Sequence, residues 1–156
     1  MISYRSAVAE DVPVIRDLLQ ALSDHDGGPE VGPAGALLKH GFGDRPLFRA
    51  VLAEKDGEAV GLVLFYPDFS TMRGEPGVYV QDLFVDERLR GQGIGRQLLA
   101  RARSLADACW GARYLTLSVG PENASAKSAY AKLGFRPRGY DFLILDGEAL
   151  ASLERP

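Results

Sequence analysis

Three glycines alternate within five residues at Gly91, Gly93 and Gly95, in a segment that joins a predicted strand to a predicted helix. Glycines this close together are unfavourable unless the backbone needs their conformational freedom. A loop of this kind turns its N–H groups outward at the positive end of a helix, where the missing side chains let an anion approach. Arg90 and Arg96 add positive charge on either side. The segment predicts a pyrophosphate-binding loop, with a tight turn that begins a helix as the structural alternative.

Apolar periodicity places this loop inside a chain that alternates between strands and helices. Residues 78–85 (VYVQDLFV) are rich in β-branched and aromatic side chains and predict the strand before the loop. After the loop, apolar residues from Ile94 to Cys109 recur at helical spacing, so Cys109 is expected in the core. Asp56-Gly57 predicts a hairpin turn between antiparallel strands, and Gly41 is expected to end a short helix. The pattern predicts strands at 2–7, 47–54, 59–66, 78–85, 114–119 and 142–145, and a loop at 67–77. It also predicts a helix that begins at residue 12 and is stopped by residues 26–29, and further helices at 34–40, 94–109, 123–133 and near the C-terminus.

Length and composition restrict the class of protein. No linker or repeat divides the 156 residues, so we expect one α/β domain over 1–156. One cysteine and two histidines exclude an internal disulfide and a Cys/His metal cluster. No stretch approaches the roughly 20 apolar residues of a membrane span, and the first residues lack the apolar core of a signal peptide. We expect a cytoplasmic protein with no metal and no membrane partner, and the net charge of −3 does not indicate a nucleic-acid partner.

Charge is unevenly divided along the chain. Residues 1–77 carry 7 Lys/Arg against 12 Asp/Glu, whereas residues 78–156 carry 11 against 9. This division suits an anionic ligand on the C-terminal half and a cationic ligand facing the N-terminal half. Scattered solvated charge is the alternative explanation.

Three kinds of anion-binding loop can be compared with the glycine segment. A Walker phosphate loop needs Gly-Lys-Ser/Thr, which this chain lacks. A dinucleotide-binding fingerprint fails at its third glycine, where Arg96 stands, although Glu122 could serve as a ribose-binding acid and keeps this alternative open. The acetyl-coenzyme A loop, Q/R-x-x-G-x-G/A, is satisfied in full by residues 90–95 (RGQGIG).

The chain resembles the GCN5-related N-acetyltransferase (GNAT) superfamily in three segments: DLFV at 82–85, the glycine loop, and NASAKSAYAKLGF at 123–135. The resemblance implies a mixed, largely antiparallel sheet flanked by helices and split between its fourth and fifth strands, here 78–85 and 114–119. Acetyl-CoA would lie in that split. Asn123, which also suits a helix cap, would bond the pantetheine arm. The other cofactor-binding residues implied by the resemblance are Leu83, Phe84, Val85, Arg90, Gly91, Gln92, Gly93, Ile94, Gly95 and Arg96.

Within the superfamily, the chain is most similar to the diamine (spermidine/spermine) acetyltransferases. The segments that carry this similarity are 37–46 (LLKHGFGDRP), the 78–85 strand and 139–153 (GYDFLILDGEALASL). The resemblance implies a homodimer and a cationic acceptor, with Asp24 and Asp26 near the position of the branch's amine-binding acids. In one departure, Gln81 replaces the branch's acidic residue. A glutamine amide does not accept a proton at useful pH, so the base at this position is left open between Asp82 and a water chain.

Formation of an amide from a thioester needs a neutral amine to attack and a thiolate to leave. A phenol, whose pKa is ordinarily about 10, can protonate that thiolate. Tyr130 lies on the predicted helix after the fifth strand, where the family has its general acid, with an ordinary core tyrosine as the alternative.

We therefore expect an acetyl-CoA-dependent N-acetyltransferase that acts on the primary amine of a small molecule by direct attack in a ternary complex. A polyamine or a basic amino acid is the expected acceptor. The alternatives are a CoA-binding module without catalysis and a GNAT enzyme that acts on a protein or antibiotic amine.

Overall fold

An antiparallel meander of four strands, extended by one parallel strand, forms the centre of the fold. The computed structural model describes residues 1–156, which divide into two compact units, Met1–Ser118 and Val119–Pro156. The sheet belongs to the first unit, and its strand order is β1-β2-β3-β4-β5. The strands are β1 (Ile2–Ser6), β2 (Arg49–Lys55), β3 (Glu58–Ser70), β4 (Glu75–Val85) and β5 (Leu115–Leu117).

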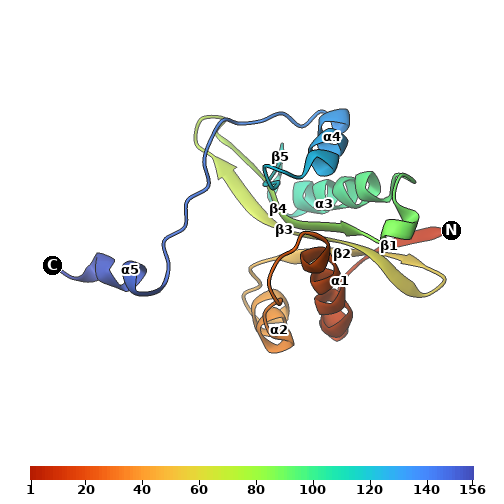
Figure 1. The fold of residues 1–156 in the computed structure, drawn as a ribbon, viewed down its shortest axis with the longest axis horizontal. Helices are drawn as coiled ribbons and strands as arrows, with labels where there is room; N and C mark the ends of the chain where they lie inside the picture. Colours follow the sequence, from red (N-terminus) through yellow and green to blue (C-terminus); the bar gives the residue numbers. More distant parts are fainter. The chain divides into compact units, whose positions relative to one another are not determined.

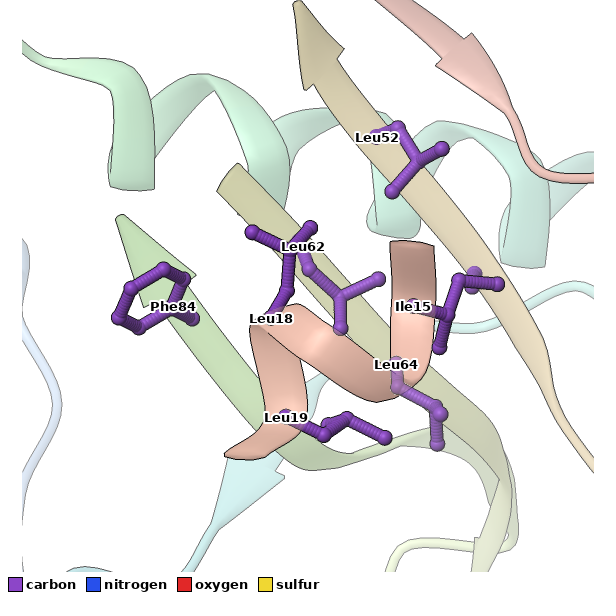
Figure 2. Close-up of a cluster of buried hydrophobic side chains, with 8 residues drawn as sticks. Ile15, Leu18, Leu19, Leu52, Leu62, Leu64 and Phe84 are labelled. Carbon is purple, nitrogen blue, oxygen red and sulfur yellow. The ribbon is translucent and has the colours of Figure 1, made fainter. Parts of the chain in front are cut away.

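Helices cover both faces of this sheet (Figure 1). Helices α1 (Val12–His25) and α2 (Ala34–Phe42) lie on one face, and α3 (Ile94–Trp110) lies on the other. The apolar stripe of α1 packs on alternate residues of the strands, which face the same side because side chains alternate along a strand. This cluster comprises Ile15, Leu18, Leu19, Ala50, Leu52, Leu62, Leu64 and Phe84 (Figure 2).

The Asp56-Gly57 hairpin is confirmed. Asp56 has φ 52° and Gly57 has φ 83°. Positive φ at both central residues is the signature of the type I′ turn, whose twist matches that of the flanking strands. The turn joins β2 and β3, which pair antiparallel from Arg49–Phe65 to Lys55–Glu58.

The loop expected at 67–77 is wrong, because β3 and β4 continue as a two-stranded arm past the last β2 partner. A residue outside the arm supports it: the Tyr114 hydroxyl donates to Asp68 Oδ2 at 2.5 Å. The Trp110 indole Nε1 also donates to the Gly77 carbonyl at 2.9 Å. Gly77 is needed here, because a Cβ at this position would overlap the Tyr114 ring.

Three further expectations differ from the structure. Gly41 lies inside α2 instead of ending it. Its glycine serves packing, because the Phe48 ring lies where a Cβ would stand. Cys109 is exposed, since Trp110 takes the core-facing position at the end of α3 and packs on Phe65 with ring centroids 6.4 Å apart. Residues 142–145 form no strand.

The second unit contains α4 (Ala124–Leu133) and the short α5 (Gly147–Ala151). Asn123 caps α4, and Gly134 ends it in the left-handed conformation with φ 98°. Residues 142–145 are exposed although all four are apolar. In the whole chain, no helix combines the length and apolar character needed to cross a membrane.

Candidate active site

The sheet opens where β4 and β5 separate. Their parallel pairing covers only Val78–Leu115, Tyr79–Thr116 and Val80–Leu117. Beyond Val80, β4 continues to Val85 with β3 on one side and no β5 partner on the other. The expected split between the fourth and fifth strands is therefore present, and it begins at Gln81.

An extra residue in β4 lies at the start of this split. Val80 pairs with Phe65, but Asp82 pairs with Leu64, so Gln81 has no partner of its own on β3. This is a β-bulge, in which two residues of one strand oppose one residue of the other. Because the bulge interrupts the alternation, Gln81 and Asp82 lie on the same face of the sheet as α1.

Several contacts establish that shared face. Asp82 is opposite Leu64, a member of the α1 cluster, and two residues before Phe84, which belongs to the same cluster. Gln81 accepts a hydrogen bond at Oε1 from the hydroxyl of Tyr66, at 2.9 Å. Tyr66 is two residues after Leu64 on β3 and so shares its face.

Asp82 is the titratable group most changed by this environment. Its carboxyl is partly buried, and the burial raises its pKa to about 6, because a low-dielectric surrounding disfavours the charged form. Asp82 forms no salt bridge that would offset the effect. A carboxylate of this kind can accept and return a proton near neutral pH.

Two tyrosines surround the bulge. The rings of Tyr66 and Tyr79 are stacked, with centroids 5.2 Å apart and an interplanar angle of 25°. The Tyr79 and Ser118 hydroxyls are 2.8 Å apart, which links β4 to the chain just after β5. Burial, reinforced by the charges of Tyr79, Asp82 and Asp68, raises the pKa of Tyr66. Tyr66 therefore keeps its proton at neutral pH and remains a hydrogen-bond donor.

The glycine loop follows β4 and has the geometry expected of an anion site. Gly91 and Gly93 have φ of 78° and 81°, and open space lies where a Cβ would project. No backbone N–H from Gly91 to Arg96 donates to a backbone carbonyl, as is usual for the first turn of a helix. Gly95 faces the other way, and a Cβ there would lie 3.8 Å from Val85. These residues fit the pyrophosphate of a CoA cosubstrate.

A short helical turn, Glu87–Leu89, holds the start of the loop. Asp86 caps this turn by accepting from the backbone N–H of Arg88 at 3.0 Å. The Arg88 guanidinium also bonds the Asp86 carboxylate, and these hydrogen bonds lower the pKa of Asp86 to about 2. Asp86 therefore stays ionised and keeps these hydrogen bonds down to about pH 2.

Arg90 is engaged by the protein itself. Its Nε donates to the Val85 carbonyl at 3.1 Å, and its Nη1 is 3.4 Å from Nε2 of His25. The end of α1 therefore lies beside the glycine loop. Asp24 and Asp26 flank His25 and are exposed, and the Asp24 carboxylate accepts from the amide of Gln20 at 2.9 Å.

The strand-end residues Leu83, Phe84 and Val85 divide between the two faces. Leu83 and Val85 lie beside Gly95 on the α3 side. The Phe84 ring is packed in the α1 cluster and only 9% exposed, so a cofactor would meet its backbone and not its side chain.

The second unit carries the other two predicted residues. The Asn123 side chain accepts from the Ala126 N–H at 3.1 Å, as expected of a helix cap. Tyr130 packs edge-on against Phe135, with ring centroids 5.5 Å apart. Seven residues, about two helical turns, separate Asn123 from Tyr130, so both side chains lie on one side of α4.

Sequence reasoning missed Tyr66, Tyr79 and Ser118 as members of the site. Tyr66 and Tyr79 lie in strands whose apolar patterns gave no sign of a polar cluster. Their juxtaposition depends on the register between β3 and β4 and on the bulge at Gln81. No local sequence signal specifies either.

Comparison with known proteins gives the family. A family model of the acetyltransferase (GNAT) family matches residues 15–135. Thialysine N-epsilon-acetyltransferase of Bos taurus is 32% identical over 130 residues, which are 76% of this chain and 75% of that protein. Spermidine/spermine N(1)-acetyltransferase-like protein 1 of Homo sapiens is 31% identical over 111 residues, 65% of this chain but 16% of that protein.

Comparison with solved structures supports the fold. An integron cassette protein from the mobile metagenome of V. cholerae superimposes with a TM-score of 0.80, covering 99% of this chain and 98% of that one at 18% identity. The two chains therefore share the same overall fold. With the family match over most of its length, the chain belongs to the GNAT family of acetyl-CoA-dependent N-acetyltransferases, in which it is related to the diamine acetyltransferases.

Proposed function

We propose that this chain transfers the acetyl group of acetyl-CoA to the primary amine of a small cationic acceptor, with Asp82 as the general base. The observation that carries the proposal is the position of Asp82: a carboxyl with a pKa of about 6, beside a bulge, at the start of the strand split. Gln81 shares its face but has no ionisable proton site. We therefore propose Asp82 as the base that the sequence left open.

In the proposed reaction, acetyl-CoA supplies the thioester carbon that the amine attacks directly. Above about pH 6 the Asp82 carboxylate is ionised and can accept the proton that the ammonium group loses. The new N–C bond forms as the C–S bond breaks, and the sulfur leaves as a thiolate. Tyr130 is proposed to donate its phenolic proton to that thiolate, which leaves a neutral thiol. The second proton, which the nitrogen loses as it becomes an amide, then restores the phenol.

The glycine loop is proposed to hold the cosubstrate. The N–H groups of residues 91–96 would bond the pyrophosphate, while Arg96 would add charge. Arg90, which is bonded to Val85, would act mainly by shaping the loop. The unpaired side of β4 at Leu83–Val85 would bond the pantetheine arm. The family resemblance implies the same ligand for Asn123.

A cationic acceptor is supported by three observations. Two relatives are named for thialysine and for spermidine/spermine, which are basic amines. The faces of Tyr66 and Tyr79 are suited to a cation, since aromatic rings attract positive charge. Asp24 and Asp26, on the acidic half of the chain, would contribute longer-range attraction.

The test is the release of free CoA thiol from acetyl-CoA by the purified protein in the presence of a panel of amines, with the acetylated amine identified by mass spectrometry. We expect turnover with small basic amines and none with acetyl-CoA alone. Binding of acetyl-CoA without turnover on any amine would instead indicate a non-catalytic CoA-binding module.

A further inference from the structure

We propose that the acceptor carries a hydrogen-bond-accepting oxygen three bonds from its reacting nitrogen, as an amino acid or an aminoacyl amide does, and that the amide N–H of Gln81 binds this oxygen. The inference rests on the proposed function, since it narrows the acceptor class of the same site. It would distinguish this chain from an enzyme built for simple diamines.

Gln81 and Asp82 lie close together because of the bulge in β4. In a regular strand these consecutive residues would face opposite sides of the sheet. The bulge between the Phe65 and Leu64 pairings instead puts both on the α1 side. The group that would receive the ammonium proton and the Gln81 amide therefore lie next to each other.

A hydrogen bond from Tyr66 orients the Gln81 amide. A glutamine side chain has one acceptor oxygen and an NH₂ group with two donors. The Tyr66 hydroxyl donates to Oε1 of Gln81 at 2.9 Å, so this oxygen faces Tyr66 and the NH₂ group points away from it. Since the pKa of Tyr66 is raised, its hydroxyl stays protonated and keeps this polarity.

Tyr79 and Ser118 hold Tyr66 in place. Its ring stacks on Tyr79 at 5.2 Å, and Tyr79 is linked to Ser118 by a hydroxyl contact of 2.8 Å. A chain of contacts from the end of β5 to the bulge thus fixes the direction of the Gln81 amide. Tyr66 is a positioning residue in this arrangement, because it acts through Gln81.

The resulting site offers a carboxylate and, beside it, an N–H donor. An ammonium group with a nearby carbonyl or carboxylate oxygen matches both groups. A diamine would place its second ammonium against N–H donors, leaving polar groups unsatisfied, which is how binding sites reject close analogues. An acidic residue at position 81 would reverse this preference.

The experiment compares kcat/KM for glycinamide and for ethylenediamine, which have backbones of equal length. We expect the wild-type protein to favour glycinamide. Gln81→Glu should lower the ratio of kcat/KM for glycinamide to kcat/KM for ethylenediamine by about 10-fold or more, since one hydrogen bond is exchanged for a repulsive contact. Tyr66→Phe should lower it by roughly 3-fold or more by releasing the amide. Tyr4→Phe, on the opposite edge strand β1, is the matched control and should leave the ratio unchanged.

Because a ratio cancels changes in CoA binding and in the amount of folded protein, it isolates the recognition of the acceptor. A wild-type preference for ethylenediamine, or a ratio unmoved by both Gln81→Glu and Tyr66→Phe, would overturn the inference while the acetyltransferase proposal stands. If Gln81→Glu does not fold, Gln81→Met must lower the ratio in its place. Absence of acetylation of any amine would overturn the proposed function, and the inference with it.

Discussion

At the residue scale, the chemistry of this site depends on where two neighbouring side chains of β4 are placed. Burial alone raises the pKa of Asp82 to about 6, and no ion pair is involved. The same burial opposes ionisation in the folded state, so the group is thermodynamically costly. A costly carboxyl at the mouth of a strand split is typical of a functional residue.

Asp82→Asn tests this assignment. We expect kcat/KM to fall by about 10²- to 10⁴-fold, the usual loss of a general base, and the acidic limb of the pH profile near pH 6 to disappear. The pKa of Asp82 is raised in the folded state, so the folded state binds more protons than the unfolded state between the ordinary carboxyl value of 3.8 and about 6. Stability therefore falls as pH rises through that window. The variant should therefore have a melting temperature at pH 7.5 no lower than that of the wild type. A variant with wild-type turnover would remove Asp82 from the mechanism.

Tyr130→Phe tests the proposed general acid. Phenylalanine keeps the ring contact with Phe135 and removes only the hydroxyl. We expect kcat to fall by roughly 10²- to 10⁴-fold with little change in the Kd of acetyl-CoA measured by calorimetry. The alkaline limb of the pH–rate profile should also move if the phenol sets it. Unchanged kcat would make water the proton donor.

At the scale of elements, the glycine loop can be separated into its two requirements, a left-handed backbone and open space. Gly93 begins α3 with φ 81°, and Gly111 ends the same helix with φ 70°. Neither has an atom within 4 Å of a built Cβ. The two positions impose the same backbone strain at opposite ends of one helix.

Gly93→Ala and Gly111→Ala therefore form a matched pair. Each should lose about 1–2 kcal/mol of stability, because a Cβ disfavours the left-handed conformation. Only Gly93→Ala should weaken acetyl-CoA binding in calorimetry, since its Cβ projects into the space proposed for the pyrophosphate. Equal affinities in the two variants would place the cosubstrate elsewhere.

Some of these structural elements could be predicted from the sequence, and others could not. The Asp56-Gly57 turn, the cap at Asn123 and the glycine loop depend on residues that are adjacent in the chain, and each was predicted correctly as a local structure. The sequence predicts a loop where the arm of β3 and β4 lies, because the support of the arm comes from Tyr114, 46 residues away from Asp68. The bulge at Gln81 was not predicted, since it is a mismatch between two strands. The sequence therefore limits the candidate base to Asp82 or a water chain, but it does not decide between them.

At the scale of the whole molecule, the C-terminal segment bears on oligomeric state. The side chains of Leu143 and Ile144 are 92% and 84% exposed, within a run of four apolar residues. Contiguous exposed apolar residues usually mark an association surface. We therefore expect a homodimer, as the family resemblance implies, in which residues 142–145 are covered.

Light scattering should give a mass about twice the 16.9 kDa of one chain. The double variant Leu143→Ser, Ile144→Ser should shift that mass toward the monomer by removing apolar area from the contact. Met72→Ser is the control, since Met72 is 95% exposed in the β3–β4 turn and outside this segment. A wild-type protein that stays monomeric at high concentration would contradict the dimer.

Because of the bulge, the chemistry of the site depends on the number of residues in β4 as well as on their identity. If one residue were deleted at position 81, Val80 and Asp82 would follow one another opposite Phe65 and Leu64, and the ladder would become regular. Such a chain would keep its core and its glycine loop, yet it would carry one side chain at the mouth of the split where two now stand. A single-codon deletion at this position would therefore leave a well-folded protein with altered chemistry, and homologous sequences should be aligned with the number of residues between Tyr79 and Asp82 held constant.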